Sequence, residues 1–298
     1  MVNLGSVFYG TIGAMLTLCV CAAHADVIHE ERSLYRNIII NEAVGQRCMS
    51  FVVKVRAYNN QTCIFLENRK KMVFDYTKVV TGALLAKPNP DKILIVGLGG
   101  GTLPIAFREL LPNAQITSVE IDPAVVKAAK AYFGYQEDKR MNTVIQDARV
   151  YIKRALRGDE KWDFIVLDAF NGDYIPEHLM TQEFLQEVRS LLRPGGLVVS
   201  NTFSSSRLYD HESVTYAAVF PQLKMLRSSN NSGNRVLLAA QEPFTLPAQN
   251  VDLAQWQTRF SPYGIEVSTI LTSEKPANWD KSAKVLTDQF VPANLLKH

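Results

Sequence analysis

The residues best suited to chemistry begin at Gly97, where a glycine-rich turn directly follows an apolar run. In ILIVGLGGGTLPIAF the run predicts a buried strand, and Gly97, Gly99 and Gly101 lead from it into an expected helix. Such glycines let a ligand approach the backbone, and Glu120, about twenty residues on, can accept hydrogen bonds from both ribose hydroxyls. The pattern indicates a nucleoside site, although Glu120 could instead be a solvated strand end. No lysine follows the glycines, which argues against an ATPase.

Asp147 and Ala148 follow the third strand of the same pattern, in QDAR. The carboxylate of Asp147 can accept a hydrogen bond from the amino group of an adenine, which would complete a nucleoside pocket. The competing interpretation is that Asp147 caps the helix that follows, because aspartate is a favoured N-cap residue. Both roles stay open, and Ala148 is expected beside Asp147 in the cofactor site.

Asp168 ends the fourth strand, in DFIVLDAF. Open α/β sheets bind ligands in the crevice at the carboxyl ends of their strands, so we expect this carboxylate to face the same crevice. Asp173 and Glu177 follow within nine residues, with Tyr174 between them. An acidic loop with aromatic side chains suits an alkyl diammonium cation. The alternative is a solvated acidic loop in which Asp168 caps the next turn.

Strands and helices alternate from Tyr76 onward. A helix is expected over 76–86, and apolar runs then predict six strands with helices between them. These runs are KILIVGL, QITSVEI, NTVIQD, DFIVLDAF, LVVSNTF and RVLLAA. Continuous apolar strands are typical of a doubly wound, mostly parallel sheet buried on both faces. We expect a helix-to-strand turn at RPGG, 193–196, and helical pieces carrying Trp256 and Trp279 packed on the edge of the sheet.

The chain before Tyr76 has a different pattern. Short β-rich runs, NIIINEA, CMSFVVKV and CIFLE, alternate with polar turns and predict a small antiparallel β domain. We place this domain at 26–75 and the Rossmann-like domain at 76–298. Cys48 and Cys63 flank a hairpin expected to turn near Tyr58-Asn59-Asn60, so they could form a disulfide; two buried free thiols fit the spacing equally well.

The order of GLGGG, VEIDP, QDAR and LDAF is that of the S-adenosylmethionine-dependent transferases. The chain resembles the spermidine synthase (polyamine aminopropyltransferase) family in particular, from about Ser33 to Ala240. Further points of resemblance are SLYRNI at 33–38, the pair Asp75-Tyr76, and DAFNGDYIPEHL after the fourth strand. The resemblance implies a Rossmann-like class I methyltransferase fold preceded by the small antiparallel β domain.

The resemblance also implies a reaction, the transfer of an aminopropyl group from decarboxylated S-adenosylmethionine to a diamine such as putrescine. In the family the counterpart of Asp168 is the base, because an ammonium ion cannot attack the carbon beside a sulfonium until it loses a proton. Neither a permanently bound cofactor nor a metal is expected. The resemblance also implies that the protein forms a homodimer. The residues expected around the amine are Asp75, Tyr76, Asn171, Asp173, Tyr174 and Glu177, with Asp173 as a second catalytic acid.

Departures from the family cluster at the reacting end. The family's glycine run reads GGGDGG, and here we take the neutral Thr102 to stand in the place of its acid. Arg36 replaces a glutamine, and Thr77-Lys78 replaces His/Gln-Glu after the tyrosine. The second strand-end acid aligns with Asn171, and only a local shift brings Asp173 into its role. Two alternatives therefore stay open: a non-catalytic envelope protein that binds a nucleoside or polyamine, and an S-adenosylmethionine-dependent methyltransferase.

Charge and the N-terminal segment bear on partners and location. The net charge is +3 over 298 residues with scattered Lys and Arg, so nucleic-acid binding has no electrostatic footprint. The apolar run from Val7 to Ala23 ends in Ala23-His24-Ala25, a signal-peptide cleavage pattern, and predicts export to the periplasm or beyond. The alternatives are a misassigned start codon and an uncleaved membrane anchor, since the segment before the run lacks Lys and Arg.

Overall fold

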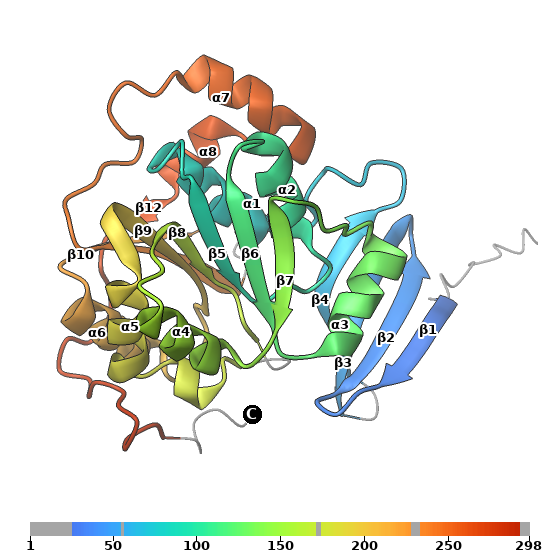
Figure 1. Ribbon diagram of the computed structural model, residues 1–298, viewed down its shortest axis with the longest axis horizontal. Helices are drawn as coiled ribbons and strands as arrows, with labels where there is room; N and C mark the ends of the chain where they lie inside the picture. The colour runs from blue at the N-terminus through green and yellow to red at the C-terminus, as the bar shows by residue number, and fades with distance from the viewer. Residues whose placement is uncertain (1–25, 55–56, 171–173, 228–232, 293–298) are drawn as a thin grey trace, which may run out of the picture.

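Two β-sheets organise the protein, whose computed structural model describes residues 26–54, 57–170, 174–227 and 233–292 (Figure 1). The expected signal peptide therefore lies outside the described residues. The smaller sheet has the order β1-β2-β3-β4, with every neighbouring pair antiparallel. Its strands are β1 (Asp26–Arg32), β2 (Asn37–Ala43), β3 (Gln46–Lys54) and β4 (Ala57–Phe65).

The larger sheet has eight strands in the order β12-β10-β11-β9-β8-β5-β6-β7. Strands β9, β8, β5, β6 and β7 run parallel, whereas β11, β10 and β12 add an antiparallel edge beside β9. The bounds are β5 (Lys92–Val96), β6 (Gln115–Glu120), β7 (Met141–Ile145), β8 (Trp162–Leu167), β9 (Leu192–Phe203), β10 (Gln222–Leu226), β11 (Asn234–Ala240) and β12 (Glu274–Lys275). A mostly parallel α/β sheet after a small antiparallel one confirms the expected fold class.

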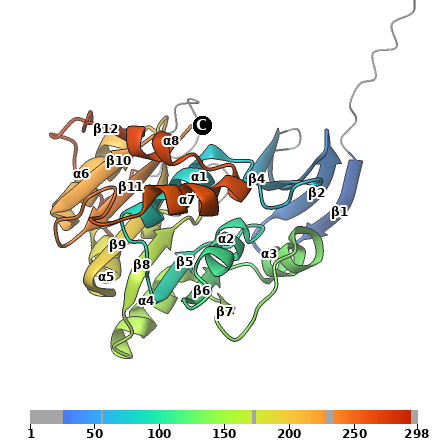
Figure 2. The same ribbon diagram turned by 90° about the horizontal axis from the view of Figure 1, so that it is seen from above.

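Helices cover both faces of the larger sheet (Figure 2). Helices α1, α2, α7 and α8 pack on one face, and α4, α5 and α6 pack on the other. The helices are α1 (Asp75–Gly82), α2 (Thr102–Leu110), α3 (Pro123–Ala128), α4 (Ala148–Arg157), α5 (Gln182–Ser190), α6 (Tyr209–Val219), α7 (Leu253–Phe260) and α8 (Val267–Thr272). Single turns are η1 (Ala83–Leu85), η2 (Ala129–Phe133), η3 (Glu177–Leu179) and η4 (Ser261–Tyr263).

The sequence of β5 shows why this sheet must be buried on both faces. Ile93 and Ile95 point into the core shared with α1 and α2, while Leu94 and Val96 point into the core shared with α4 and α5. Successive side chains of a strand alternate between faces, so an unbroken apolar run needs cover on both. Each of these four side chains is at most 1% exposed.

The smaller sheet packs on α3 and η2, beside the β7 end of the larger sheet (Figure 1). Its buried side chains, which include Ile38, Ile40 and Met49, meet Val125 and Phe133 there. This packing holds the face of the small sheet against the segment that follows β6, and so beside the expected nucleoside site.

The hairpin of β3 and β4 corrects one expectation and explains another. Lys54 of β3 already pairs with Ala57 of β4, so Tyr58-Asn59-Asn60 lie within β4 rather than in the turn. The register places Cys48 directly opposite Cys63, and their sulfur atoms are joined at 2.00 Å in the structure.

Two further expectations were wrong. The RPGG segment at 193–196 lies inside the start of β9, because the β8–β9 ladder tolerates an irregularity there. Trp279 is not helical, and Trp256 lies in α7, which packs on a face of the sheet with α1 rather than on its edge. The edge is instead formed by β12.

The described residues carry no helix that is long and apolar enough to cross a membrane. Within the same residues, no group of three or more His, Cys, Asp and Glu side chains is arranged to hold a metal ion.

Candidate active site

A pocket opens at the carboxyl ends of the parallel strands, where β5 and β6 lie beside the small sheet. Eight of the residues expected from the sequence line it: Tyr76, Gly97, Gly99, Thr102, Glu120, Asp147, Ala148 and Asp168. They come from turns that are distant in sequence, so the fold gathers the nucleoside-type residues and the expected base around one space.

The glycine turn has the backbone that only glycine adopts easily. Gly97 and Gly101 have φ values of 100° and 82°, in the left-handed region. Gly97 lines the pocket. Gly101 does not, because it precedes α2 and packs on Tyr135, whose ring would lie 2.8 Å from a β-carbon at that position. Gly101 is therefore a packing and turn residue rather than a wall of the pocket.

Glu120 is anchored on both of its oxygens. One accepts a hydrogen bond of 3.1 Å from the backbone N–H of Leu98 and the other a bond of 3.0 Å from that of Asp122. The side chain is buried, and burial raises its pKa, an effect opposed by these N–H groups and by the charge of Arg36. Each oxygen keeps a second lone pair for a ligand. The carboxylate is therefore fixed in place with acceptor capacity left for two hydroxyls.

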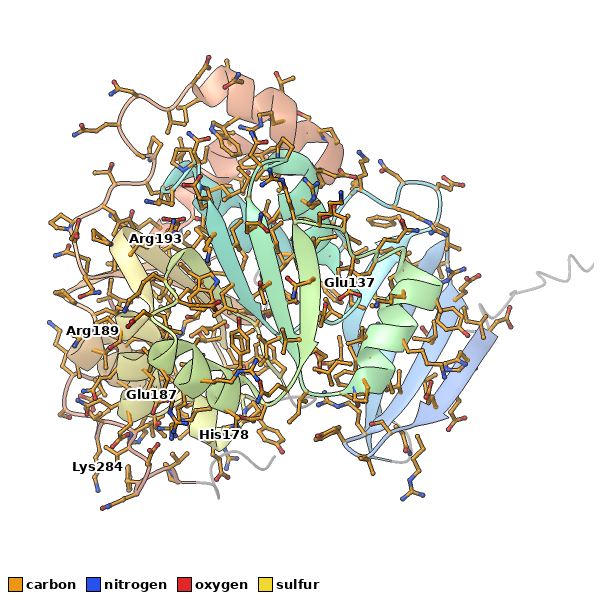
Figure 3. All side chains as sticks on the ribbon, in the orientation of Figure 1. Glu137, His178, Glu187, Arg189, Arg193 and Lys284 are labelled. Carbon is orange, nitrogen blue, oxygen red and sulfur yellow. A yellow bond between two sulfur atoms is a disulfide. The ribbon has the colours of Figure 1, made fainter. Side chains whose placement is uncertain are left out.

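Asp147 performs the capping role that the sequence left open. One oxygen accepts a hydrogen bond of 2.9 Å from the N–H of Val150 and so caps α4, while the other lies 3.0 Å from Nε2 of His178. His178, labelled in Figure 3, comes from η3 and lies beside the start of α4. Helix capping does not exclude a ligand, because both residues and Ala148 line the pocket.

Gln146 was missed in the sequence, although it directly precedes Asp147. It lines the pocket, and its buried Oε1 atom has no hydrogen-bond partner among the described residues. A buried acceptor without a partner is costly unless a ligand satisfies it. An adenine amino group is a donor of the required kind.

Asp168 lies just past the end of β8, and two side chains hold its carboxylate. Asn201 of β9 donates a 2.8 Å hydrogen bond to Oδ1, and the Tyr76 hydroxyl of α1 lies 3.4 Å from Oδ2. Burial raises the pKa of Asp168 to about 7, although both hydrogen bonds act to lower it. A carboxylate with a pKa near neutrality can accept a proton and release it at physiological pH. Asn201, two residues before the last residue of β9, was also missed.

Of the remaining residues expected around the amine, those that the structure describes are not brought into this pocket. Asp75 forms an ion pair of 2.9 Å with Lys78, and neither lines the space. Tyr174 lies outside the lining, and Glu177 is exposed in η3. Two others, Asn171 and Asp173, lie outside the described residues.

A cation and several neutral side chains line the part of the pocket next to the small sheet. Arg36 stacks on the ring of Phe51, 4.3 Å from its centroid, and donates a bond of 3.3 Å to the Phe170 carbonyl. Thr62 and Thr102 approach each other at 3.3 Å across the mouth of the glycine turn. Arg36, Phe51, Thr62 and Thr102 all line the pocket, and Phe51 and Thr62 had no sequence signal.

The Thr62 side chain also occupies the space in front of Gly100. A β-carbon on Gly100 would lie 2.7 Å from Cγ2 of Thr62, so the fourth residue of the glycine run has no room for a side chain. Thr102, the residue compared with the family's acid, is neutral. The glycine turn therefore presents no acid to the pocket at either position.

A buried ion pair supports the strand ends behind Asp168. Arg235 of β11 is fully buried and donates to Oγ1 of Thr202 at 2.8 Å and to Oγ of Ser213 at 2.6 Å. Its guanidinium also lies 3.3 Å from Glu212, whose pKa burial raises to about 7. These contacts connect β9 and β11 to α6. They explain how α6, which buries polar residues and lacks an amphipathic pattern, packs on the sheet.

The fold and the pocket define a Rossmann-like protein of the class I methyltransferase type. A model of the spermine/spermidine synthase domain matches residues 72–225, just over half of the chain. A polyamine aminopropyltransferase from Vibrio vulnificus (strain CMCP6) is 46% identical over 278 residues, which cover 91% of each chain. The chain belongs to the spermine/spermidine synthase family.

Solved structures agree on the fold. A probable spermidine synthase from Corynebacterium glutamicum superposes with a TM-score of 0.63 at 18% identity, over 87% of this chain and 99% of the other. Human methyltransferase-like protein 13, solved in complex with SAH, gives a TM-score of 0.53 at 26% identity, over 74% of this chain and 99% of the other.

Proposed function

We propose that the protein is a polyamine aminopropyltransferase, which moves an aminopropyl group from decarboxylated S-adenosylmethionine to a diamine such as putrescine. The observation that carries the proposal is Asp168: a half-buried carboxylate, whose pKa burial raises to about 7, lies in the same pocket as Glu120 and the glycine turn. Family membership and the 46% identity with a polyamine aminopropyltransferase support the same reaction.

The donor would bind along the nucleoside-type residues. Its ribose hydroxyls would donate to Glu120, which is already fixed by two backbone N–H groups. Its adenine amino group would donate to the free Oε1 of Gln146 or to Asp147, beside Ala148. The left-handed turn at Gly97 lets the sulfonium end approach the backbone near Asp168.

Asp168 would act on the acceptor amine. The carboxylate takes a proton from the ammonium group, and the freed nitrogen lone pair attacks the methylene carbon beside the sulfonium. The new N–C bond forms as the C–S bond breaks, so methylthioadenosine leaves as a neutral product. The desolvation that raises the pKa of Asp168 also makes it a stronger base, and Tyr76 and Asn201 hold it in place.

Product analysis tests this function. Purified protein given decarboxylated S-adenosylmethionine and putrescine should yield spermidine and methylthioadenosine in equal amounts, as measured by mass spectrometry. A panel of other amines would identify the preferred acceptor. Methylthioadenosine without a polyamine product would mean that the donor is hydrolysed, and a methylated product from S-adenosylmethionine would mean methyl transfer.

Export is the second part of the proposal. The apolar N-terminal run with its Ala-His-Ala site supports cleavage after Ala25 and a periplasmic location. The Cys48–Cys63 disulfide of the structure is compatible with an oxidising compartment. Intact mass of the protein recovered from its native host tests this: a mature chain should begin at Asp26, and a cytosolic chain that begins at Met1 would refute export.

The domain boundaries and the oligomer complete the proposal. A β domain of 26–75 is supported by the separate four-stranded sheet, and a homodimer is supported by family membership. Exposed apolar side chains on the small sheet and its loops, Val27, Leu34 and Val44, offer surface for such contacts. Light scattering during size-exclusion chromatography would report the mass in solution, and a monomer at micromolar concentration would contradict the proposed homodimer.

A further inference from the structure

Two asparagine side chains, Asn234 and Asn201, form a row of hydrogen bonds that ends at the carboxylate of Asp168. Asn234 of β11 donates a 3.0 Å hydrogen bond to Oδ1 of Asn201, and Asn201 donates a 2.8 Å bond to Oδ1 of Asp168. Asn201 is 3% exposed. Neither asparagine is needed to form the sheet, because the ladder of β9 and β11 is made by the backbone.

The ladder explains why these two amides meet. In the antiparallel register of β9 and β11, Asn201 lies opposite Val236 and Asn234 lies opposite Phe203. Asn234 is thus the diagonal neighbour of Asn201 on the same face, within reach of its side chain. Tyr76, on α1, approaches the carboxylate from the other side.

The direction of the bonds has a chemical consequence. Because the Asn201 oxygen already accepts from Asn234, its NH₂ group must face Asp168. Oδ1 of Asp168 is then an acceptor, and a proton placed on it would meet an N–H donor. Among the described residues, Oδ2 receives the Tyr76 hydroxyl at 3.4 Å, a long contact that leaves this oxygen able to take a proton.

We propose that the Asn234–Asn201 amide pair is a positioning device, which keeps Oδ1 of Asp168 unprotonated and directs the proton of the attacking amine onto Oδ2. The inference rests on the proposed aminopropyl transfer. Asn201 and Asn234 are positioning residues, since neither lines the pocket of the proposed active site and both act through Asp168.

Other charged groups surround Asp168, and they must stay constant for the inference to be tested. Arg36 reaches the Phe170 carbonyl from the small sheet, and Glu120 lines the pocket at the end of β6. On α1 Asp75 forms an ion pair with Lys78, and behind β9 the pair Arg235–Glu212 is buried. Replacing an asparagine by a neutral residue alters none of these charges.

The test is the titration of Asp168 in the whole protein. Carboxyl ¹³C NMR on aspartate-labelled protein follows the group directly, with its signal assigned by its loss in Asp168→Asn. Asn201→Leu removes the donor, so the midpoint should rise by about one to two pH units, the scale of a hydrogen bond to a charged group. Asn234→Ala only frees the Asn201 amide to turn, so its midpoint should rise by a smaller amount, about half a unit.

Transfer kinetics supply the second reading. The rate lost by Asn201→Leu at pH 7 should recover at pH 9, because a base with a raised pKa is deprotonated there. Asn142→Leu is the matched control: Asn142 is a strand asparagine that bonds Thr117 across β6 and β7, and it is exposed and remote from the pocket. Its titration and rate profiles should match the wild type.

Unshifted Asp168 midpoints in both Asn201→Leu and Asn234→Ala would overturn the inference. So would a rate loss in Asn201→Leu that is equal at every pH, since that indicates a structural role. Asn234→Ala decides the question if Asn201→Leu does not fold, because Asn234 does not touch Asp168. The NMR titration can be measured even if the protein catalyses no reaction. A failure of the proposed reaction is therefore distinguishable from a failure of the positioning role of the Asn234–Asn201 amide pair.

Discussion

A β-carbon on Gly97 would lie 2.3 Å from the carbonyl oxygen of Asp168. The glycine turn and the proposed base are therefore in direct backbone contact. The N–H of Asp168 also donates a hydrogen bond to the carbonyl of Val96, the residue before Gly97. The two halves of the proposed site, for nucleoside and amine, therefore depend on the same few atoms at the ends of β5 and β8.

Gly97→Ala should disable both halves at once. The new methyl group must displace the Asp168 backbone, and alanine is strained at a φ of 100°. We expect at least tenfold weaker binding of methylthioadenosine by calorimetry, together with loss of transfer. Gly45→Ala is the matched control, since Gly45 has a similar φ of 73° with open space around it. A Gly97→Ala protein that binds and turns over normally would show that the contact is unimportant.

Asp168→Asn should make the protein more stable at high pH. The pKa of Asp168 is about 7 in the folded protein and 3.8 for the ordinary group, so the folded state binds more protons between these values. Wild-type stability is then lost as pH rises from about 4 to about 7, and an amide avoids that loss. Asp168 is only half-buried, so solvent screens part of this effect. We therefore expect Asp168→Asn to raise the free energy of unfolding by about 1–3 kcal/mol at pH 8 and not at all below pH 4.

Urea unfolding of both proteins at pH 4 and pH 8 measures the difference. A gain of the same size at both pH values would mean that the effect is unrelated to ionisation of Asp168. A loss of stability at pH 8 would mean that the ionised carboxylate is stabilising, contrary to the burial that raises its pKa.

The disulfide should contribute substantially to folding. Cys48 and Cys63 are separated by 15 residues, and closing such a loop contributes about 3 kcal/mol in the chain-entropy model. Replacing both cysteines by alanine should lower the free energy of unfolding by about this amount, and reduction of the wild type should have a similar effect. Two free thiols in denatured, unreduced protein taken from the periplasm would show that the bond does not form there.

Weak discrimination between donors should distinguish this chain from its family. Neither Gly100 nor Thr102 brings an acid to the pocket, whereas Arg36 lines it with a positive charge. The glycine turn therefore adds no acid that would repel the carboxylate of S-adenosylmethionine, and we expect its Kd to lie within about tenfold of that of the decarboxylated donor. Methylthioadenosine should bind well because it has no charged tail.

Calorimetry with the three ligands and three variants measures this preference. Thr102→Asp should favour the decarboxylated donor, and Arg36→Gln should weaken S-adenosylmethionine selectively. Lys78→Gln should change neither, since Lys78 is paired with Asp75 outside the pocket. A strong preference of the wild type for the decarboxylated donor would mean that another acid has taken over the selection.

Much of the fold could be predicted because the parallel strands are buried on both faces and leave unbroken apolar runs. Helix α6 could not, since its buried Glu212, Ser213 and Thr215 break the amphipathic pattern. Their partners include groups distant in sequence: Arg235 for Glu212 and Ser213, and the Leu286 N–H for Thr215. Strand β1 lies at an edge and is mostly exposed, so it lacks an apolar signature.

The candidate site divides in the same way. Glu120, Asp147 and Asp168 sit at strand ends, where local sequence indicates a crevice, and the structure places all three on the pocket. Asn201 had the same signal at the end of β9 and was overlooked. Phe51 and Thr62 reach the pocket only because the small sheet packs beside β6 and α3, which no local pattern encodes.

The role of Asp168 as the general base is tested most directly by two measurements on one preparation of Asp168→Asn at pH 7. These are the rate of aminopropyl transfer and the affinity for methylthioadenosine. The rate should fall by roughly 10²-fold or more, the scale of losing a general base, because no other described carboxylate is held by Tyr76 and Asn201 in the pocket. The affinity should stay within about twofold of the wild type, since Glu120 and the glycine turn remain intact. An unchanged rate with unchanged affinity would contradict the account and make Asp168 a structural residue.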